Sequence, residues 1–159
     1  MSQNEKPVKY TVRSVAWEGF VGAGRLIHFP SAKNESVDVP VPSDIPESEP
    51  LATLTVSGDS LERVGIFDGD VVLCRKIVSK KQIKPDTVCI VYSPSTGETN
   101  AKKISFSGEH LRLKYCGYGD IKDDYVLADE VEIRGIVISA TRRRNEWPFV
   151  DGDHGDILF

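Results

Sequence analysis

The sequence predicts an all-β protein, built mainly of strands with short helical turns. Short runs rich in β-branched and aromatic residues recur along the chain, and Thr-Val-Cys-Ile-Val-Tyr at 87–92 is the clearest of them. Turns rich in glycine and proline separate these runs, as at Pro94-Ser95-Thr96-Gly97. Apolar residues almost nowhere keep the 3.6-residue period of a helix over ten or more positions. These three observations favour a β-rich body.

The first part of the chain is expected to lead into that body. Residues 10–16 alternate weakly, as a strand or an extended arm would, and residues 17–24 are expected to form a loop. Residues 30–50 hold five of the nine prolines, so we expect a surface connection there, with an edge strand at 37–39. Residues 51–56 are then expected to form a strand.

The remaining elements follow at short intervals. A helical turn is expected at 60–64, and further strands are expected at 71–75, 87–92, 98–104, 111–115 and 131–138. Residues 116–130 are expected to form a loop. The acidic tail after residue 144 carries four large apolar residues, which favours docking on the body or on a partner; these are Trp147, Phe149, Leu158 and Phe159.

Composition excludes several classes of protein. The 159 residues suffice for one well-cored domain, and the net charge of −4 gives no basic excess for a broad nucleic-acid surface. Apolar runs are too short to cross a bilayer, and no signal peptide is recognisable. Cys74, Cys89 and Cys116 form an odd set without paired spacing, which favours a cytoplasmic location with Cys74 and Cys89 in the core. No cysteine or histidine spacing suits a metal, so neither a metal nor another cofactor is expected.

Ser60 and Lys102 are the residues most suggestive of chemistry. Ser60 follows Gly58-Asp59 at the end of an apolar run, and Lys102 lies on an expected strand. A serine hydroxyl attacks well only when a neighbouring base takes its proton, and a lysine is that base only when burial leaves it neutral. Taken alone, Gly-Asp-Ser is more often a simple turn, and a strand lysine is more often solvated. Their order, spacing and flanking residues together favour a Ser-Lys pair.

The turn after Ser60 is expected to be structural. In Gly65-Ile66-Phe67-Asp68-Gly69-Asp70, glycine supplies a turn and the two aspartates bond backbone groups. A calcium loop is disfavoured because no further ligands follow at suitable spacing.

These motifs resemble those of the LexA/UmuD family of self-cleaving serine peptidases. The resemblance covers roughly residues 20–140 and lies in Val56 to Leu61, Gly65 to Asp70, and Lys102-Lys103-Ile104. It implies a β-rich fold like those of LexA and signal peptidase. It also implies Ser60 as nucleophile, Lys102 rather than Lys103 as general base, and the backbone amides of Asp59 and Ser60 as oxyanion donors. The chain departs from the family at Leu61, where methionine is usual, and at Cys116-Gly117, where a loop with proline and asparagine is usual.

The family cuts its own chain before a glycine, and here Ala23-Gly24 matches, 36 residues before Ser60. Small residues let the backbone approach the nucleophile closely. The implied organisation is a flexible arm over residues 1–24, a peptidase domain over 25–144 and a tail over 145–159.

The resemblance also implies a biological setting. Only 23 residues precede the expected cleavage bond, too few for a helix-turn-helix domain, so the UmuD-like form is expected. That form implies a role in the SOS response to DNA damage and in mutagenesis. It also implies cleavage stimulated by the RecA–single-stranded DNA filament, and an error-prone DNA polymerase subunit as partner. A homodimer is expected through Val131–Thr141, with neither a DNA-binding domain nor membrane association.

Three alternatives stay open. The chain fits the peptidase and dimerisation region of a LexA-like or phage repressor, which regulates transcription. It also fits a peptidase that cuts in trans, related to signal peptidases, or an interaction module of the same fold that does not cut. The basic cluster Arg142-Arg143-Arg144 is expected to be a solvated strand end, with contact to an acidic partner or DNA as the sharper alternative.

Overall fold

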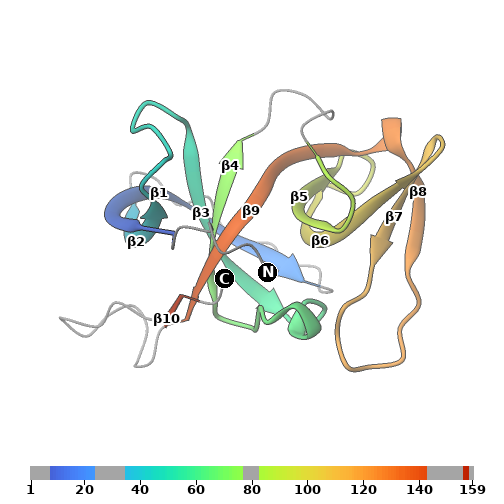
Figure 1. The fold of residues 1–159 in the computed structure, drawn as a ribbon. Helices are drawn as coiled ribbons and strands as arrows, with labels where there is room; N and C mark the ends of the chain where they lie inside the picture. Colours follow the sequence, from blue (N-terminus) through green and yellow to red (C-terminus); the bar gives the residue numbers. More distant parts are fainter. Residues whose placement is uncertain (1–7, 24–34, 77–82, 143–155, 158–159) are drawn as a thin grey trace, which may run out of the picture.

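Strands dominate the computed structural model of the chain, which describes residues 8–23, 35–76, 83–142 and 156–157 (Figure 1). The strands are β1 (Tyr10–Ala23), β2 (Ser36–Pro42), β3 (Leu51–Gly58), β4 (Val71–Lys76), β5 (Thr87–Ser93), β6 (Glu98–Ser107), β7 (His110–Lys114), β8 (Asp124–Leu127), β9 (Glu132–Arg142) and β10 (Asp156–Ile157). Two short 3₁₀ helices, η1 (Glu62–Val64) and η3 (Ala128–Glu130), complete the described elements. The predicted all-β class is confirmed.

The strands pair in the order β2-β1-β3-β4-β9-β5-β6-β7-β8, and β10 pairs with the end of β9. One further pairing, between Gly22 of β1 and Asn100 of β6, joins the two distant parts of this order. The path from β1 through β3, β4, β9 and β5 to β6 therefore closes on itself. The closing point lies at the end of β1, next to the residues predicted to react.

Apolar side chains gather in three clusters. The first lies within the closed path and includes Val21, Leu54, Val56, Leu61, Ile66, Ala101 and Val137. The second joins β1 and β2 to β4 through Val15, Val37, Val39, Val41, Ile45, Val71 and Leu73. The third lies on the other face of β5 and β6 and includes Cys89, Val91, Ile104, Leu111 and Val131. Alternate residues of β5 and β6 thus serve two different clusters, as the two-residue period of a strand requires.

The structure differs from the sequence prediction at residues 17–24, because residues 17–23 continue strand β1 and do not form a loop. The pairing register shifts between Trp17 and Phe20, and Gly19 there has a φ of 105°. This bulge bends the strand, so that its first half pairs with β2 and its second half with β3. The glycine bulge interrupts the alternation of residues along the strand, so this segment resembles a loop when only its sequence is considered.

Most other expected strands are confirmed within a few residues, including the edge strand β2 and the β5–β6 hairpin. Residues 116–130 were expected to form a loop, but they contain β8 and η3.

Cys74 and Cys89 are buried and unpaired, as predicted. The described helices are far too short to span a membrane. Gly24, Arg143, Arg144 and the aromatic residues of the tail lie outside the described residues.

Candidate active site

Ser60 lies in a turn just beyond the end of β3. Gly58 turns the chain with a φ of 117°, and its N–H donates a 2.9 Å hydrogen bond to Asp68 Oδ1. Ser60 is fully buried, and its Oγ has no hydrogen-bond partner among the described residues. A buried hydroxyl without a partner is costly, and such groups in a folded protein call for an explanation such as a catalytic role.

The residues after Ser60 hold this turn from one side. Asp70 is almost fully buried, accepts a 2.7 Å hydrogen bond from the Phe67 N–H, and forms two 3.1 Å bonds with the Arg142 guanidinium. Arg142 also donates to the Gly65 carbonyl and stacks over the Phe67 ring at 4.5 Å from its centroid. The predicted backbone-bonding role of Asp68 and Asp70 is confirmed. Arg142 is neither a merely solvated strand end nor a free charge, because it anchors this turn.

A second segment, which the sequence prediction missed, holds the turn from the other side. The Cys116 N–H donates a 2.7 Å hydrogen bond to the Ser60 carbonyl, and the Arg63 N–H donates a 2.6 Å bond to the Cys116 carbonyl. Gly117 passes so close that a Cβ there would stand 2.8 Å from the Asp59 carbonyl oxygen. We call residues 115–117 the strap. The glycine at 117 and the turn motif at 58–60 were both visible in the sequence, but nothing in it links them.

The end of β1 lies between the two strands that lead to Ser60 and Lys102. Gly22 pairs with Ser57 of β3 and with Asn100 of β6, and all three strands run parallel. Ala23 pairs with Gly58, two residues before Ser60. Lys102 follows Asn100 by two residues, so it shares the same face of β6. The structure thus brings Ala23, Ser60 and Lys102 to one end of the closed path.

Lys102 lines a cavity of about 370 Å³ on the outer side of β6. Its neighbours around this cavity include Val91 of β5, Leu113 of β7, and Asp124 and Val126 of β8. Burial lowers the pKa of the Lys102 amine, and the charge of Asp124 acts in the opposite direction. The expectation of a lysine in partly apolar surroundings agrees with this environment. No hydrogen bond joins Ser60 Oγ to Lys102 in this state of the site, because that oxygen has no partner within the described part of the chain.

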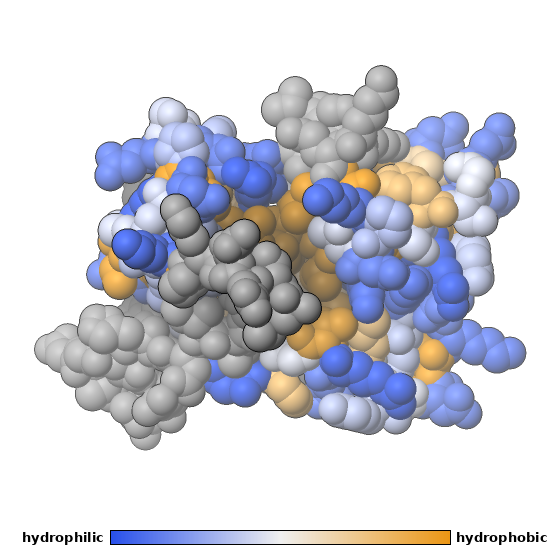
Figure 2. Space-filling view, in the orientation of Figure 1, coloured by the Kyte–Doolittle hydropathy of each residue, from blue (hydrophilic) through white to orange (hydrophobic). Residues whose placement is uncertain are grey.

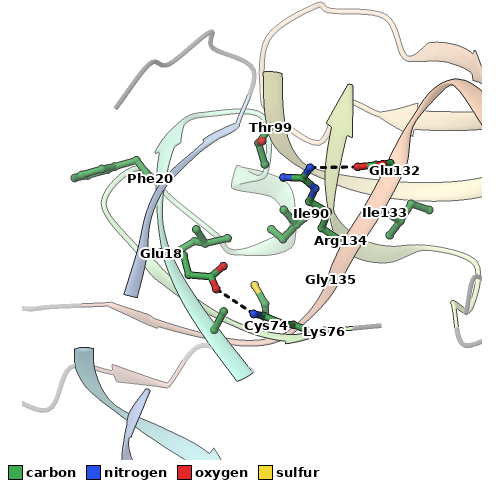
Figure 3. Close-up of a pocket in the computed structure, with 12 residues that line it drawn as sticks. Glu18, Phe20, Cys74, Lys76, Ile90, Thr99, Glu132, Ile133, Arg134 and Gly135 are labelled. Carbon is green, nitrogen blue, oxygen red and sulfur yellow. Dashed lines mark hydrogen bonds and ion pairs between the residues drawn. The ribbon is translucent and has the colours of Figure 1, made fainter. Parts of the chain in front are cut away.

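A larger cavity, of about 570 Å³, is lined by residues of the six strands that form the closed path, β1, β3, β4, β9, β5 and β6. In Figure 2 a hollow floored by apolar residues is visible between β4 and β5. Leu54, Cys74 and Ile90 contribute to the lining. Two ion pairs border it in Figure 3, Lys76 with Glu18 and Arg134 with Glu132, each at 3.2 Å. The charges at this rim therefore neutralise one another.

Among the described residues, no group of three or more His, Cys, Asp or Glu side chains is placed to hold a metal ion. The described groups near the end of β1 include a hydroxyl, an amine of lowered pKa and the backbone amides of a tight turn.

The sequence between residues 16 and 138 matches the model of a known protein family, described as peptidase S24-like. The match covers most of the chain and includes both Ser60 and Lys102. The chain belongs to the peptidase S24-like family. The resemblance found in its motifs is therefore confirmed.

Curated relatives of this S24-like chain include several LexA repressors. It is 35% identical over 127 residues to the LexA repressor of Lacticaseibacillus casei, which covers 78% of this chain and 56% of that protein. It is 30% identical over 129 residues to the LexA repressor of Alcanivorax borkumensis, and this match covers 81% of this chain and 59% of that protein. The chain thus spans less than two thirds of the length of these relatives. It is an S24 peptidase-like domain related to LexA repressors.

Proposed function

We propose that this domain is a self-cleaving serine peptidase in which Ser60 attacks the carbonyl carbon of Ala23. The observation that carries the proposal is the position of β1, which at Gly22, next to Ala23, pairs with both of the strands that lead to Ser60 and Lys102. The scissile bond, Ala23–Gly24, is then the first peptide bond beyond the strand. Because the substrate is part of the same chain, attack is intramolecular and much of its entropic barrier is removed in advance.

Lys102 acts first as a base and then as an acid. It accepts the Ser60 hydroxyl proton while the Ser60 oxygen bonds to the Ala23 carbon, and the resulting oxyanion faces the amides of Asp59 and Ser60. When the carbon–nitrogen bond breaks, the Lys102 ammonium returns that proton to the Gly24 amine. Water, deprotonated by Lys102, then hydrolyses the ester, which leaves a carboxylate on Ala23 and regenerates the Ser60 hydroxyl.

The unpartnered Ser60 hydroxyl is consistent with a site at rest. For reaction, the Lys102 amine must move from the wall of its cavity to within hydrogen-bond distance of Ser60 Oγ. Catalytic hydrogen bonds often form only when the reacting complex assembles. Such a requirement suits a reaction that waits for a trigger. We propose the RecA–single-stranded DNA filament as that trigger, within the SOS response.

Two settings remain for the cleaved product. In the UmuD-like setting it joins an error-prone DNA polymerase subunit in mutagenesis. In the repressor setting the domain is the peptidase and dimerisation region of a LexA-like protein. The repressor setting is favoured because the relatives of the chain are named LexA repressors. In both we propose a homodimer through β9. Among the described residues, β4 pairs along one edge of β9, whereas β5 pairs along the other edge up to Ile136 and β10 pairs with Thr141 and Arg142. The edge left for pairing in this part of the chain is therefore Val137–Ala140.

Mass spectrometry of the chain after incubation at alkaline pH tests the proposal. We expect a new N-terminus at Gly24, formed with first-order kinetics that do not depend on protein concentration. Ser60→Ala should abolish the cut, whereas Ser57→Ala, the nearest other serine of the motif, should retain it. A Ser60→Ala chain that still cuts itself, or a wild-type chain cut only elsewhere, would contradict the mechanism. A rate that rises with concentration would indicate cutting in trans.

A further inference from the structure

We infer that Asp123 is a positioning residue for Ser60: it anchors the strap to the sheet, and the strap in turn holds the Ser60 turn. Asp123 lies just before β8 and acts through the strap rather than on the reacting atoms. The inference rests on the proposed function, because the position of Ser60 matters only if Ser60 reacts. The anchor itself can be tested whether or not the chain cuts itself.

The strap belongs to the loop between β7 and β8, which runs beside η1 in Figure 1. Its backbone bonds the turn, because the Cys116 N–H donates to the Ser60 carbonyl and the Cys116 carbonyl accepts from the Arg63 N–H. These two bonds alone would let the strap and the turn shift together. A fixed position for Ser60 therefore also needs a contact between the strap and the sheet.

Asp123 supplies that contact through both of its carboxylate oxygens. Its Oδ1 accepts a 2.8 Å hydrogen bond from the Tyr115 N–H, eight residues earlier in the chain. Its Oδ2 accepts a 2.8 Å bond from Arg112 Nε and lies 2.6 Å from a terminal nitrogen of the same guanidinium. Hydrogen bonds between ionised groups are stronger than those between neutral groups. One carboxylate thus ties the first residue of the strap to a side chain of β7.

Arg112 is held in place because its strand is paired on both edges. It lies opposite Ser105 of β6 and opposite Tyr125 of β8. Its guanidinium also lies 5.8 Å from the centre of the Tyr125 ring, within the range of a cation–π contact. The sheet therefore sets the position of the Asp123 carboxylate.

Asp123 and its neighbour Asp124 serve different halves of the candidate site. Successive residues of an extended segment point to opposite faces. Asp124 lines the cavity of Lys102 and acts on the charge of that amine, whereas Asp123 bonds Arg112 and the strap. Asp123 is not among the charges that shift the pKa of Lys102. Its removal should therefore slow cutting without moving the pH at which the rate rises.

The anchor is present over the whole pH range of a cutting assay. The Tyr115 N–H and the Arg112 guanidinium lower the pKa of Asp123, so its carboxylate is ionised at neutral and alkaline pH. The Asp123 side chain is 20% exposed and that of Arg112 is 42% exposed, and ion pairs so close to solvent add little to global stability. We expect the loss of Asp123 to loosen the strap more than it destabilises the fold.

Amide hydrogen exchange measured by NMR tests the anchor directly, in a Ser60→Ala background so that no chain is cut. The Cys116 amide should exchange at least about tenfold faster with Asp123→Ala than without it, while amides of the central strand β4 keep their rates. Asp123→Asn keeps an oxygen for the Tyr115 N–H but loses the charge that binds Arg112, so its Cys116 exchange rate should be intermediate.

Unchanged Cys116 exchange in a folded Asp123→Ala chain would overturn the inference. Loss of protection in β4 would show that the alanine variant does not fold, and the asparagine variant then decides. Its Cys116 amide should exchange at least about threefold faster than that of the chain with Asp123 intact, and an unchanged rate there would equally overturn the inference.

Asp86→Asn is the matched control for the loss of an ion pair. Asp86 also pairs with a cation of β7, Lys114, but the bond joins two side chains and not the strap backbone. Asparagine tolerates the φ of 64° at position 86. Cys116 exchange in this variant should stay within about twofold of the chain with Asp86 intact. Equal acceleration by Asp86→Asn and Asp123→Asn would overturn the specific role of Asp123.

Cutting rates then connect the anchor to Ser60. With Ser60 intact, Asp123→Ala should cut about 10²-fold more slowly at every pH, because a displacement of about 1 Å at a reacting group costs roughly that factor. Asp123→Asn should cut at least about tenfold faster than Asp123→Ala, and both should keep the wild-type midpoint of the rate-against-pH curve. A wild-type rate in a folded Asp123→Ala chain, or a shifted midpoint, would overturn the positioning role.

The two measurements separate this inference from the proposed function. Faster Cys116 exchange with Asp123→Ala, together with no self-cutting by the wild-type chain, would uphold the anchor and refute the proposed function. Self-cutting by the wild-type chain, with neither its rate nor the Cys116 exchange altered by Asp123→Ala, would uphold the proposed function and refute the anchor.

Discussion

The two halves of the candidate active site are built in different ways. Backbone hydrogen bonds hold the Ser60 turn from both sides, through the strap at 115–117 and through the turn anchored by Asp70 and Arg142. Lys102 instead lies on a regular strand, at the wall of an open cavity, where burial and one carboxylate act on its charge. Ser60, the proposed nucleophile, is thus controlled by its position, and Lys102, the proposed base, by its electrostatic environment.

This contrast separates the expected effects of mutations. Changes around Ser60 should reduce the cutting rate at every pH, and many should also destabilise the fold, because they move buried backbone. Changes around Lys102 should alter how the rate depends on pH and should leave stability almost unchanged. A mutation near Ser60 that altered the pH dependence of the rate, or a mutation near Lys102 that lowered the stability, would show that the two halves are coupled.

The largest effect is expected from removing the base itself. Lys102→Met should lower the cutting rate by about 10²–10⁴-fold, because no general base then accepts the Ser60 proton. The adjacent Lys103→Met is the matched control, since its side chain lies on the other face of β6, and it should stay within about threefold of wild type. Single-turnover cutting followed by mass spectrometry measures both rates. If Lys103→Met lowered the cutting rate more than Lys102→Met did, the base would be Lys103.

The next effect is expected from Gly117→Ala in the strap. The new Cβ would stand 2.3 Å from the Tyr115 hydroxyl oxygen and 2.8 Å from the Asp59 carbonyl oxygen, so either the strap or the backbone beside Ser60 must move. Overpacking of this kind destabilises by about 1–3 kcal/mol, and a displacement of about 1 Å at a catalytic group costs roughly 10²-fold in rate. We therefore expect slower cutting across the whole pH range.

Gly119→Ala is the control for that experiment. A Cβ at 119 would crowd mainly the Tyr115 hydroxyl, which belongs to a side chain and not to the backbone of the turn. We expect a rate within about threefold of wild type. If Gly117→Ala folds normally and cuts at the wild-type rate, the strap does not position Ser60.

A third prediction tests the other anchor of the turn. Arg142→Met leaves the almost fully buried Asp70 carboxylate without its cation, which should cost about 2 kcal/mol of unfolding free energy. Arg134→Met, whose ion pair with Glu132 is more than half exposed, should cost less than about 1 kcal/mol. Urea unfolding followed by circular dichroism compares the two. Equal losses would mean that burial of Asp70 adds nothing to this anchor.

The sequence predicted the Ser60 half of the site only in part. The glycines and aspartates of 58–70 are local signals, so the turn and its bonds could be anticipated from residue types. The strap could not, because Cys116 reaches Ser60 through backbone hydrogen bonds that any residue except proline could make. Strand β1 was missed at 17–23 for a related reason: a glycine bulge hides the alternation by which strands are recognised. Both the strap and this part of β1 depend on pairing between residues that lie far apart in the sequence, and composition does not reveal such pairing.

The smallest expected effect concerns the electrostatics of Lys102. Burial lowers its pKa and Asp124 partly opposes this, so Asp124→Asn should lower that pKa further. Only the neutral amine accepts the Ser60 proton. Below the pKa of Lys102 the neutral fraction grows as that pKa falls, so we expect cutting near neutral pH to be about two- to fivefold faster. At alkaline pH, where the amine is already neutral in both proteins, the two rates should converge.

Glu98→Gln is the matched control, because Glu98 lines the same cavity but is not among the charges that shift Lys102. Its pH–rate profile should overlay that of the wild type. Slower cutting by Asp124→Asn at every pH would mean that Asp124 positions a reacting group. Faster cutting that persists at alkaline pH would mean that it restrains the cleavage segment. Only a gain confined to lower pH supports the view that position governs the nucleophile while charge governs the base.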